Sequence, residues 1–209
     1  METDRYILTT AMLDGEPDAQ IILADLLEEQ GDLGLAQWAR ARKRHVVPRL
    51  ELAIGLLPFR TALSAACDFA EHAMEGLYWA EFGKNSFPLL RHWVLGSASD
   101  AQLVAACKIL TTQRAYHRTL AQRKVCHALA AAAQNARLAA HHEMAQSPKA
   151  YHFSQQCATE ARKTARYARE SLPHGAPLTE RTSRRSETDW QIAHTRKLLV
   201  DLSNGAKTS

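Results

Sequence analysis

Apolar residues recur at helical spacing along this chain, and no long stretch alternates apolar and polar residues as a half-buried strand would. Alanine, the residue with the highest helix propensity, dominates the second half. Residues 60–77 show the pattern clearly, with one helix face formed by Leu63, Ala66, Cys67, Ala70 and Met74. The sequence therefore predicts an all-α fold.

Further helices are predicted between the clusters of glycine, proline and serine that interrupt the pattern. They cover residues 3–13, 17–30, 32–44, 100–112, 115–145, 149–171 and 187–202. Breaks are expected at 46–48 and 57–59, a short helix on each side of 83–88, and a mobile connection over 173–186. The tail from Ser203 is expected to fray.

The stretch LADLLEEQGDLGLAQWARARKR predicts a helical hairpin. Gly31 suits the left-handed position that follows a helix end, and Asp32 suits the N-cap of the next helix. A DNA-reading helix-turn-helix is the weaker interpretation, because carboxylates around this turn would repel phosphates. Asp25, Glu28 and Glu29 share one helix face, but catalytic carboxylates need burial or an opposed partner, and this face is expected to be solvated. The hairpin is interpreted as a docking element.

The alanine-rich stretch KVCHALAAAAQNARLAAHHE has high helix propensity but few large side chains to bury. Ala128, Ala132, Ala136 and Ala139 would let a second helix approach closely. Core volume must then come from leucines and aromatic residues of neighbouring helices. The aromatic residues of LYWAEFGKNSFPLLRHW are expected in this core, while Lys84 and Asn85 form a candidate binding tip beside them.

Composition narrows the class of protein. The 209 residues are 46% hydrophobic and 23% charged, which is an ordinary globular balance. No run approaches ~18 apolar residues, so no transmembrane helix is expected. The start METDRYILTT lacks the features of a secretory signal. Four cysteines without a CxxC pair are expected as buried thiols in a reducing cytoplasm: Cys67, Cys107, Cys126 and Cys157.

Charge is divided unevenly along the chain. Residues 1–40 contain nine Asp or Glu against two Arg, a net charge of −7. The remaining residues contain 13 of the 22 acids and 24 of the 26 Lys or Arg, a net charge of +11. Opposite charges on two segments indicate mutual docking or two different partners, although solvated surfaces would show the same pattern.

The ten histidines raise the question of a metal site. His142, His152 and Cys157 flank a break at Ser147-Pro148 and are weak candidates for a zinc site, because they include no tight chelating pair. Interhelical hydrogen bonding or a pH-sensitive surface is the preferred interpretation of the histidines. No metal ion or other cofactor is predicted. GxSxG, HExxH, P-loop and GxGxxG motifs do not occur, which disfavours an enzyme.

A basic stripe is predicted in EARKTARYARE. Arg162, Arg166 and Arg169 follow helical spacing, with Lys163 adjacent. Such a stripe could bind an acidic partner protein or a nucleic acid. Two glutamates flank it, so a solvated face with internal ion pairs is the simpler interpretation.

Residues 7–42 resemble the repeat-companion domain common in planctomycete proteins. That family shows an aliphatic helix, an acidic turn with proline, then LADWLEERGD and a second helix with an aromatic residue. Here the motif is LADLLEEQGD, with Leu26 where the family usually has tryptophan, and Trp38 in the following helix. The resemblance covers about a sixth of the chain and implies no known chemistry.

From about residue 60 onward, the chain looks like a family of alanine-rich immunity proteins of bacterial toxin systems. The stretches that carry this resemblance are HWVLGSASDAQLVAAC, LAAHHEMAQSPKAYHFSQQC and ETDWQIAHTRKLL. It implies protein binding, in which a toxin is capped so that the producing cell survives.

These observations predict an acidic helical hairpin over residues 1–45 and an alanine-rich helical bundle over residues 60–203. The predicted function is non-enzymatic protein–protein interaction, with toxin neutralisation as its specific form and a toxin domain as the partner. One alternative is a nucleic-acid-associated protein that uses the basic helix 160–170. A second is a metal-binding helical protein that uses the His and Cys candidates.

Overall fold

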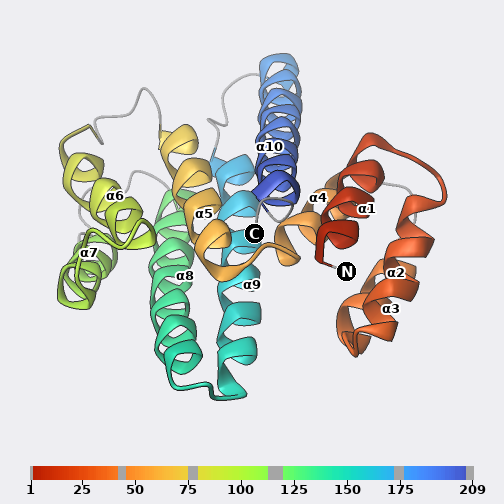
Figure 1. The fold of residues 1–209 in the computed structure, drawn as a ribbon. Coiled ribbons are helices and arrows are strands. Elements are labelled where there is room, and N and C mark those ends of the chain that lie inside the picture. The colour runs from red at the N-terminus through yellow and green to blue at the C-terminus, as the bar shows by residue number, and fades with distance from the viewer. Residues whose placement is uncertain (1, 42–45, 75–79, 113–119, 172–176, 206–209) are drawn as a thin grey trace. The chain divides into compact units, whose positions relative to one another are not determined.

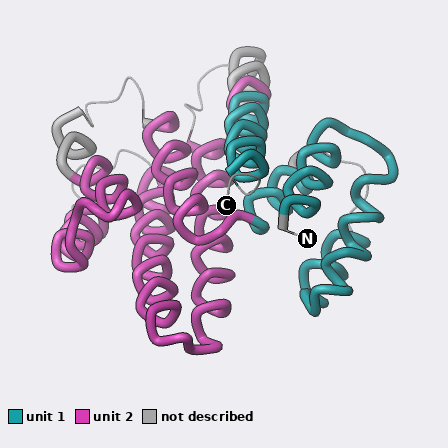
Figure 2. The backbone as a smooth tube through the Cα atoms, in the orientation of Figure 1, with its two compact units in different colours: residues 1–56, 188–209 teal, residues 57–187 magenta. Residues whose placement is uncertain are grey.

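A computed structural model describes residues 2–41, 46–74, 80–112, 120–171 and 177–205, and every regular element in these ranges is a helix. The predicted all-α fold is therefore confirmed (Figure 1). No helix within the same ranges is long and apolar enough to cross a membrane. The chain divides into two compact units, residues 1–56 with 188–209 and residues 57–187 (Figure 2).

The first unit consists of four N-terminal helices and the C-terminal part of a long last helix. These are α1 (Glu2–Asp14), α2 (Ala19–Glu29), α3 (Leu33–Ala41), α4 (Val46–Gly55) and, from residue 188, α10 (Pro177–Gly205). Helices α2 and α3 pack as a hairpin, and α1 packs against both α2 and α4. The unit's core is aliphatic, with Met12, Leu23, Leu27, Leu50 and Ile54 fully buried.

The turn between α2 and α3 has the backbone predicted from its glycine. Gly31 adopts a φ of +81°, the left-handed region that a side chain disfavours. Its N–H donates to the Glu28 carbonyl at 2.9 Å, and the Asp32 N–H donates to the Leu27 carbonyl at 2.8 Å. These two bonds form a Schellman motif, which satisfies carbonyls at the end of α2. The Gln20 side chain also donates to the Ala39 carbonyl at 2.5 Å, so the hairpin is fixed at both ends.

The break expected at 46–48 is wrong, because Val46, Val47 and Pro48 form the first turn of α4. Proline is tolerated there since first-turn N–H groups have no intrahelical partner. Because α4 packs on α1 and α3, the first unit extends to residue 56, beyond the expected limit at 45. It also includes residues 188–209, where Arg196 pairs with Asp14 of α1.

The second unit is built around the longest helical hairpin. Helix α8 (Leu120–Met144) and α9 (Lys149–Ser171) pack side by side along their length and are joined at their lower ends in Figure 1. Helix α5 (Phe59–Met74) packs against both of them. Helix α7 (Asp100–Thr112) packs on α8, and α6 (Ala80–Val94) packs on α5 and α7. The limits of α7 match the predicted helix.

Alanine forms the contact surface between these helices, as the sequence predicts. Ala128, Ala132, Ala136 and Ala139 of α8 are all buried. Helix α9 contributes a matching set of buried small residues at helical spacing: Cys157, Ala158, Ala161, Ala165 and Ala168. Larger side chains fill the remaining volume, including Leu63, Phe69, Leu90, Leu103 and Leu129, which are fully buried. Phe87 and Trp93 are buried too, whereas the predicted core residues Tyr78 and Trp79 lie outside the described part.

Two connections expected in this half of the chain are helical. Helix α6 continues through 83–88 with Pro88 inside it, and the buried Phe87, Leu90 and Trp93 on its inner face compensate for the hydrogen bond that proline removes. Helix α10 begins at Pro177, a residue suited to a first helical position, so the expected mobile connection is wrong from 177 to 186. Residues 172–176 of that connection lie outside the described part.

Candidate functional site

The predicted basic stripe on α9 is largely paired within its own helix. Lys163 bonds Glu160 at 2.6 Å, and Arg166 lies 3.9 Å from Glu170. Arg162 donates to the Thr159 hydroxyl at 2.9 Å. Arg169 is buried, so it does not belong to the exposed face. This pairing leaves less positive charge for phosphates than the sequence spacing indicates.

The second predicted contact, Lys84 and Asn85, falls within the first turns of α6 and not in an exposed loop. The side chains of both residues lie outside the described part of the chain. Ser86, the next residue, is fully buried.

The three candidate metal ligands do not converge. The His142 ring on α8 stacks on Phe153 of α9, with ring centroids 5.1 Å apart, and the His152 ring lies edge-on to the same Phe153 ring. Cys157 is buried, and its thiol donates to the Phe59 carbonyl at 3.4 Å. Among the residues that the structure describes, no group of three His, Cys, Asp or Glu side chains could hold a metal ion.

All four cysteines are free and buried. Burial raises the pKa of every thiol, to about 11 for Cys107 and about 12 for Cys126. A raised pKa keeps the thiol protonated to higher pH, and the thiolate is the nucleophile. These side chains are therefore core residues with low reactivity.

Thiol labelling tests this description. At about pH 8, all four cysteines of the folded chain should react with Ellman's reagent at least about tenfold more slowly than in the urea-unfolded chain, because burial limits both access and thiolate formation. Absorbance of the released thiolate gives both rates. One cysteine that reacts at the unfolded rate in the native protein would contradict the burial described here.

Exposed apolar residues gather on the α2–α3 hairpin. Ile21 is 61% exposed and Ile22 51% exposed on α2, and Leu33 is 56% exposed at the start of α3. Ile22 is exposed although Leu23 beside it in the sequence is buried, since the buried face of α2 is formed by Ala19, Leu23, Ala24 and Leu27. Helix geometry explains the difference, since Ile22 lies on the other side of Leu26 from this face.

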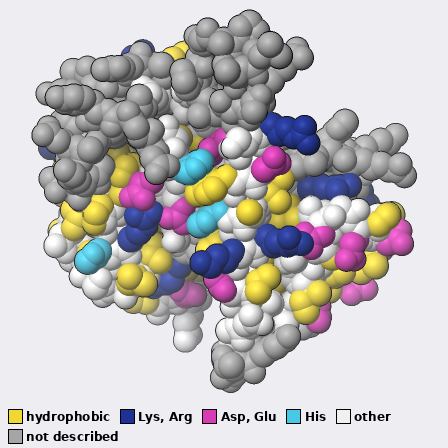
Figure 3. All heavy atoms as spheres, turned by 90° about the horizontal axis from the view of Figure 1, so that it is seen from above, with side chains coloured by type: hydrophobic (Ala, Val, Ile, Leu, Met, Phe, Trp, Pro, Cys, Tyr) yellow, Lys and Arg dark blue, Asp and Glu magenta, His cyan; other side chains and the backbone are white. Residues whose placement is uncertain are grey.

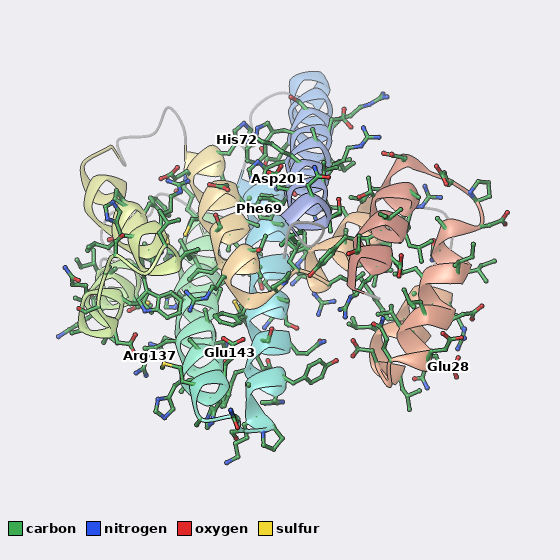
Figure 4. The ribbon with its side chains drawn as sticks, in the orientation of Figure 1. Glu28, Phe69, His72, Arg137, Glu143 and Asp201 are labelled. Carbon is green, nitrogen blue, oxygen red and sulfur yellow. The ribbon has the colours of Figure 1, made fainter. Side chains whose placement is uncertain are left out.

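Carboxylates lie on the same face of α2 as the two isoleucines, toward its C-terminal end. Asp25, Glu28 and Glu29 are exposed on α2, and Figure 4 shows Glu28 on the outer side of the hairpin. Arg40 of α3 donates to Asp25 at 2.7 Å and to Glu28. Figure 3 shows hydrophobic, acidic and basic side chains interspersed on the face of the molecule seen from above. We call the set Ile21, Ile22, Asp25, Glu28, Glu29 and Leu33 the α2–α3 surface.

The end of the α8–α9 hairpin presents a second group of exposed large side chains. Met144 is 80% exposed and Tyr151 is 56% exposed. The turn is held by the Ser147 N–H, which donates to the His142 carbonyl at 2.8 Å, and by Gln146 at a φ of 50°. Such backbone hydrogen bonds fix the path of the turn between the two helices.

One contact between distant segments was not predicted. His72, near the upper end of α5 in Figure 4, has its Nδ1 2.6 Å from Glu187, whose side chain is almost completely buried. A carboxylate can orient a histidine through such a contact, and here it joins α5 to α10 within the second unit. The two residues are 115 positions apart, so sequence spacing gave no indication that they meet.

A second cluster that sequence spacing did not indicate connects α5 and α6. Arg91 donates to both oxygens of Glu71 at 2.7 Å and to Asp68 at 2.5 Å. The hydrogen bonds to these two carboxylates raise the pKa of Arg91. Because its charges pair with one another, the cluster holds two helices together and offers little unpaired charge to a ligand.

The geometry thus offers exposed large side chains on two helical hairpins and, in the described ranges, no group of three potential metal ligands. No protein-family model, no curated protein and no solved structure matches this chain.

Proposed function

We propose that the protein is a non-enzymatic protein–protein interaction module. The observation that carries the proposal is the exposure of Ile21 and Ile22 on one face of α2, together with the exposed carboxylates of that face. Clustered apolar side chains rimmed by polar groups mark interaction surfaces, whereas isolated ones are ordinary. Met144 and Tyr151 at the end of the α8–α9 hairpin supply a second, smaller surface of the residue types enriched at interfaces.

The rigidity of the α2–α3 hairpin supports this proposal. Its turn is closed by two backbone hydrogen bonds at Gly31 and Asp32, and its inner face is buried. A surface that is ordered before binding loses less conformational entropy when the partner arrives. More of the contact energy is then available as affinity.

The burial of all four thiols also argues against catalysis by a cysteine nucleophile. The four cysteines are buried and their pKa values are raised. Arg91 and Arg40 each pair with two carboxylates of their own surroundings. The exposed side chains of the described residues include apolar and charged groups, which are the contacts that a binding surface uses. Toxin neutralisation is the specific form of binding that the resemblance of the alanine-rich part implies.

Direct binding by pure components tests the proposal. Candidate partners are captured on the immobilised full-length chain, identified and purified, and each is titrated with the chain by calorimetry. We expect one partner to bind saturably with a Kd of roughly micromolar or tighter. If that partner is a toxin, co-expression of this chain should protect the cell.

As a control, this chain and each candidate partner are denatured and refolded separately before they are mixed. This step removes any complexes that were carried over from the capture. Failure of every captured protein to bind in pure form, together with no protection against toxins encoded nearby, would refute the proposal.

A further inference from the structure

We propose that the α2–α3 surface binds a basic segment of a partner protein, which places an apolar side chain against Ile21 and Ile22. This inference rests on the proposed function and adds the chemistry of the partner. Nothing in the first unit's described helices covers these two isoleucines, which are both more than half exposed.

The residues form one continuous face of α2. Ile21, Asp25 and Glu28 follow the spacing i, i+4, i+7, and Ile22 and Glu29 are also seven residues apart. Residues at these spacings are neighbours on a helix surface. The isoleucines therefore occupy the N-terminal end of the face, and the carboxylates follow toward its C-terminal end.

The charge of the hairpin selects a cationic partner. Residues 18–40 carry five carboxylates and one guanidinium, a net charge of −4. Asp32 is partly compensated by Arg5 of α1 at 3.6 Å. The remaining negative charge would repel nucleic acid and anionic lipid, and it would attract a basic protein segment.

The contacts of Arg40 show that the carboxylates of this surface can bind a guanidinium group. Its guanidinium bonds both Asp25 and Glu28, and these hydrogen bonds raise the pKa of Arg40. All three side chains are exposed, so solvent screens the pairs and they contribute little to folding. An arginine or lysine of the partner can therefore take the place of Arg40, which makes Arg40 a competitor within the chain.

Three labelled synthetic peptides provide the probes. The first is a helical peptide with a leucine stripe flanked by lysines, the second has glutamate in place of lysine, and the third has serine in place of leucine. Binding to the full-length chain is measured by fluorescence anisotropy at low and high salt. We expect the leucine–lysine peptide to bind tightest and to weaken as salt increases, because charge pairs at an exposed surface are screened.

Variants of the surface give opposite expected effects. The double variant Ile21→Ser with Ile22→Ser should weaken the leucine–lysine peptide by at least about tenfold, because it removes both apolar contacts. Arg40→Gln should strengthen binding several-fold, because it frees Asp25 and Glu28. Circular dichroism checks that each variant is folded.

Two substitutions elsewhere serve as matched controls. Leu95→Ser removes an exposed apolar side chain and Glu143→Gln removes an exposed carboxylate, both outside this surface. Each should leave peptide binding unchanged.

Four outcomes would overturn the inference. They are equal binding of the glutamate peptide, no effect of the double isoleucine variant, weaker binding by folded Arg40→Gln, and self-association that the double variant abolishes, which would assign the surface to a second copy. If a purified natural partner binds the wild type and the double variant equally, the proposed function stands and this inference fails. If no protein partner binds the wild type, both fail.

Discussion

Replacing Phe69 with alanine should lower the free energy of unfolding by about 3–5 kcal/mol. Phe69 is fully buried in α5, a helix that packs against α6, α8 and α9 (Figure 4). Many of the surrounding core residues are alanines, whose short side chains cannot move into the space that the phenyl ring leaves. The variant should therefore retain a cavity. Urea unfolding followed by circular dichroism measures the loss.

Two further variants make this measurement specific. Phe69→Leu keeps much of the buried volume and should cost less than Phe69→Ala. Tyr151→Ala removes an exposed aromatic ring and should change the free energy of unfolding by no more than about 0.5 kcal/mol. A Phe69→Ala loss as small as that of Tyr151→Ala would contradict a core built around this ring.

Enlarging a small core residue should also destabilise the fold, by a smaller amount. Ala165→Leu is expected to lower the free energy of unfolding by about 1–3 kcal/mol. Ala165 is fully buried in α9, which packs against α8 and α5. A leucine there must push these helices apart or adopt a strained rotamer. The same urea titration gives the change.

The chain offers a matched control for this substitution. Ala105 is exposed on α7, so Ala105→Leu makes the same chemical change without crowding and should be near neutral. Equal effects at both positions would show that close helix packing through α9 is not what restricts residue 165.

The parts of the fold that local sequence determines were predicted well. The backbone at Gly31 was predicted because only a residue without Cβ adopts its φ of +81° at little cost. Helix α7 was predicted with its limits because Ser99 and Asp100 provide a clear start, and Gln102 accepts from the Ser99 N–H at 2.8 Å. The buried alanines of α8 followed from their spacing.

Tertiary contacts decide the features that were predicted wrongly. Pro88 suggests a break, yet the buried Phe87, Leu90 and Trp93 keep that face of α6 in the core and the helix continues. The polar residues after 176 suggested a connection, but they are helical and continue into the rest of α10. Sequence alone does not show how far a helix extends beyond its packed part. The domain limits at 45 and 60 rested on breaks in the sequence pattern and stay predictions, while α4, which lies between them, packs on α1.

The candidate site could be predicted only in part. The acidic hairpin was recognised from its composition, but the exposure of Ile21 and Ile22 depends on which side of α2 meets α1 and α3. The internal pairing of Lys163 with Glu160 was foreseeable from their spacing, whereas the burial of Arg169 was not. The contact between His72 and Glu187 joins distant segments and has no local signature.

The long last helix has a practical consequence for the design of truncated fragments of the protein. Because α10 begins among residues assigned to one unit and ends in the other, a cut after residue 56 separates the N-terminal helices from the segment that supplies Arg196 to Asp14. A fragment of residues 1–56 would lack that closing segment and is expected to be less stable than the intact unit. A workable fragment would instead fuse residues 188–209 to residue 56 through a flexible glycine–serine linker, so that both ends of the discontinuous unit are expressed together.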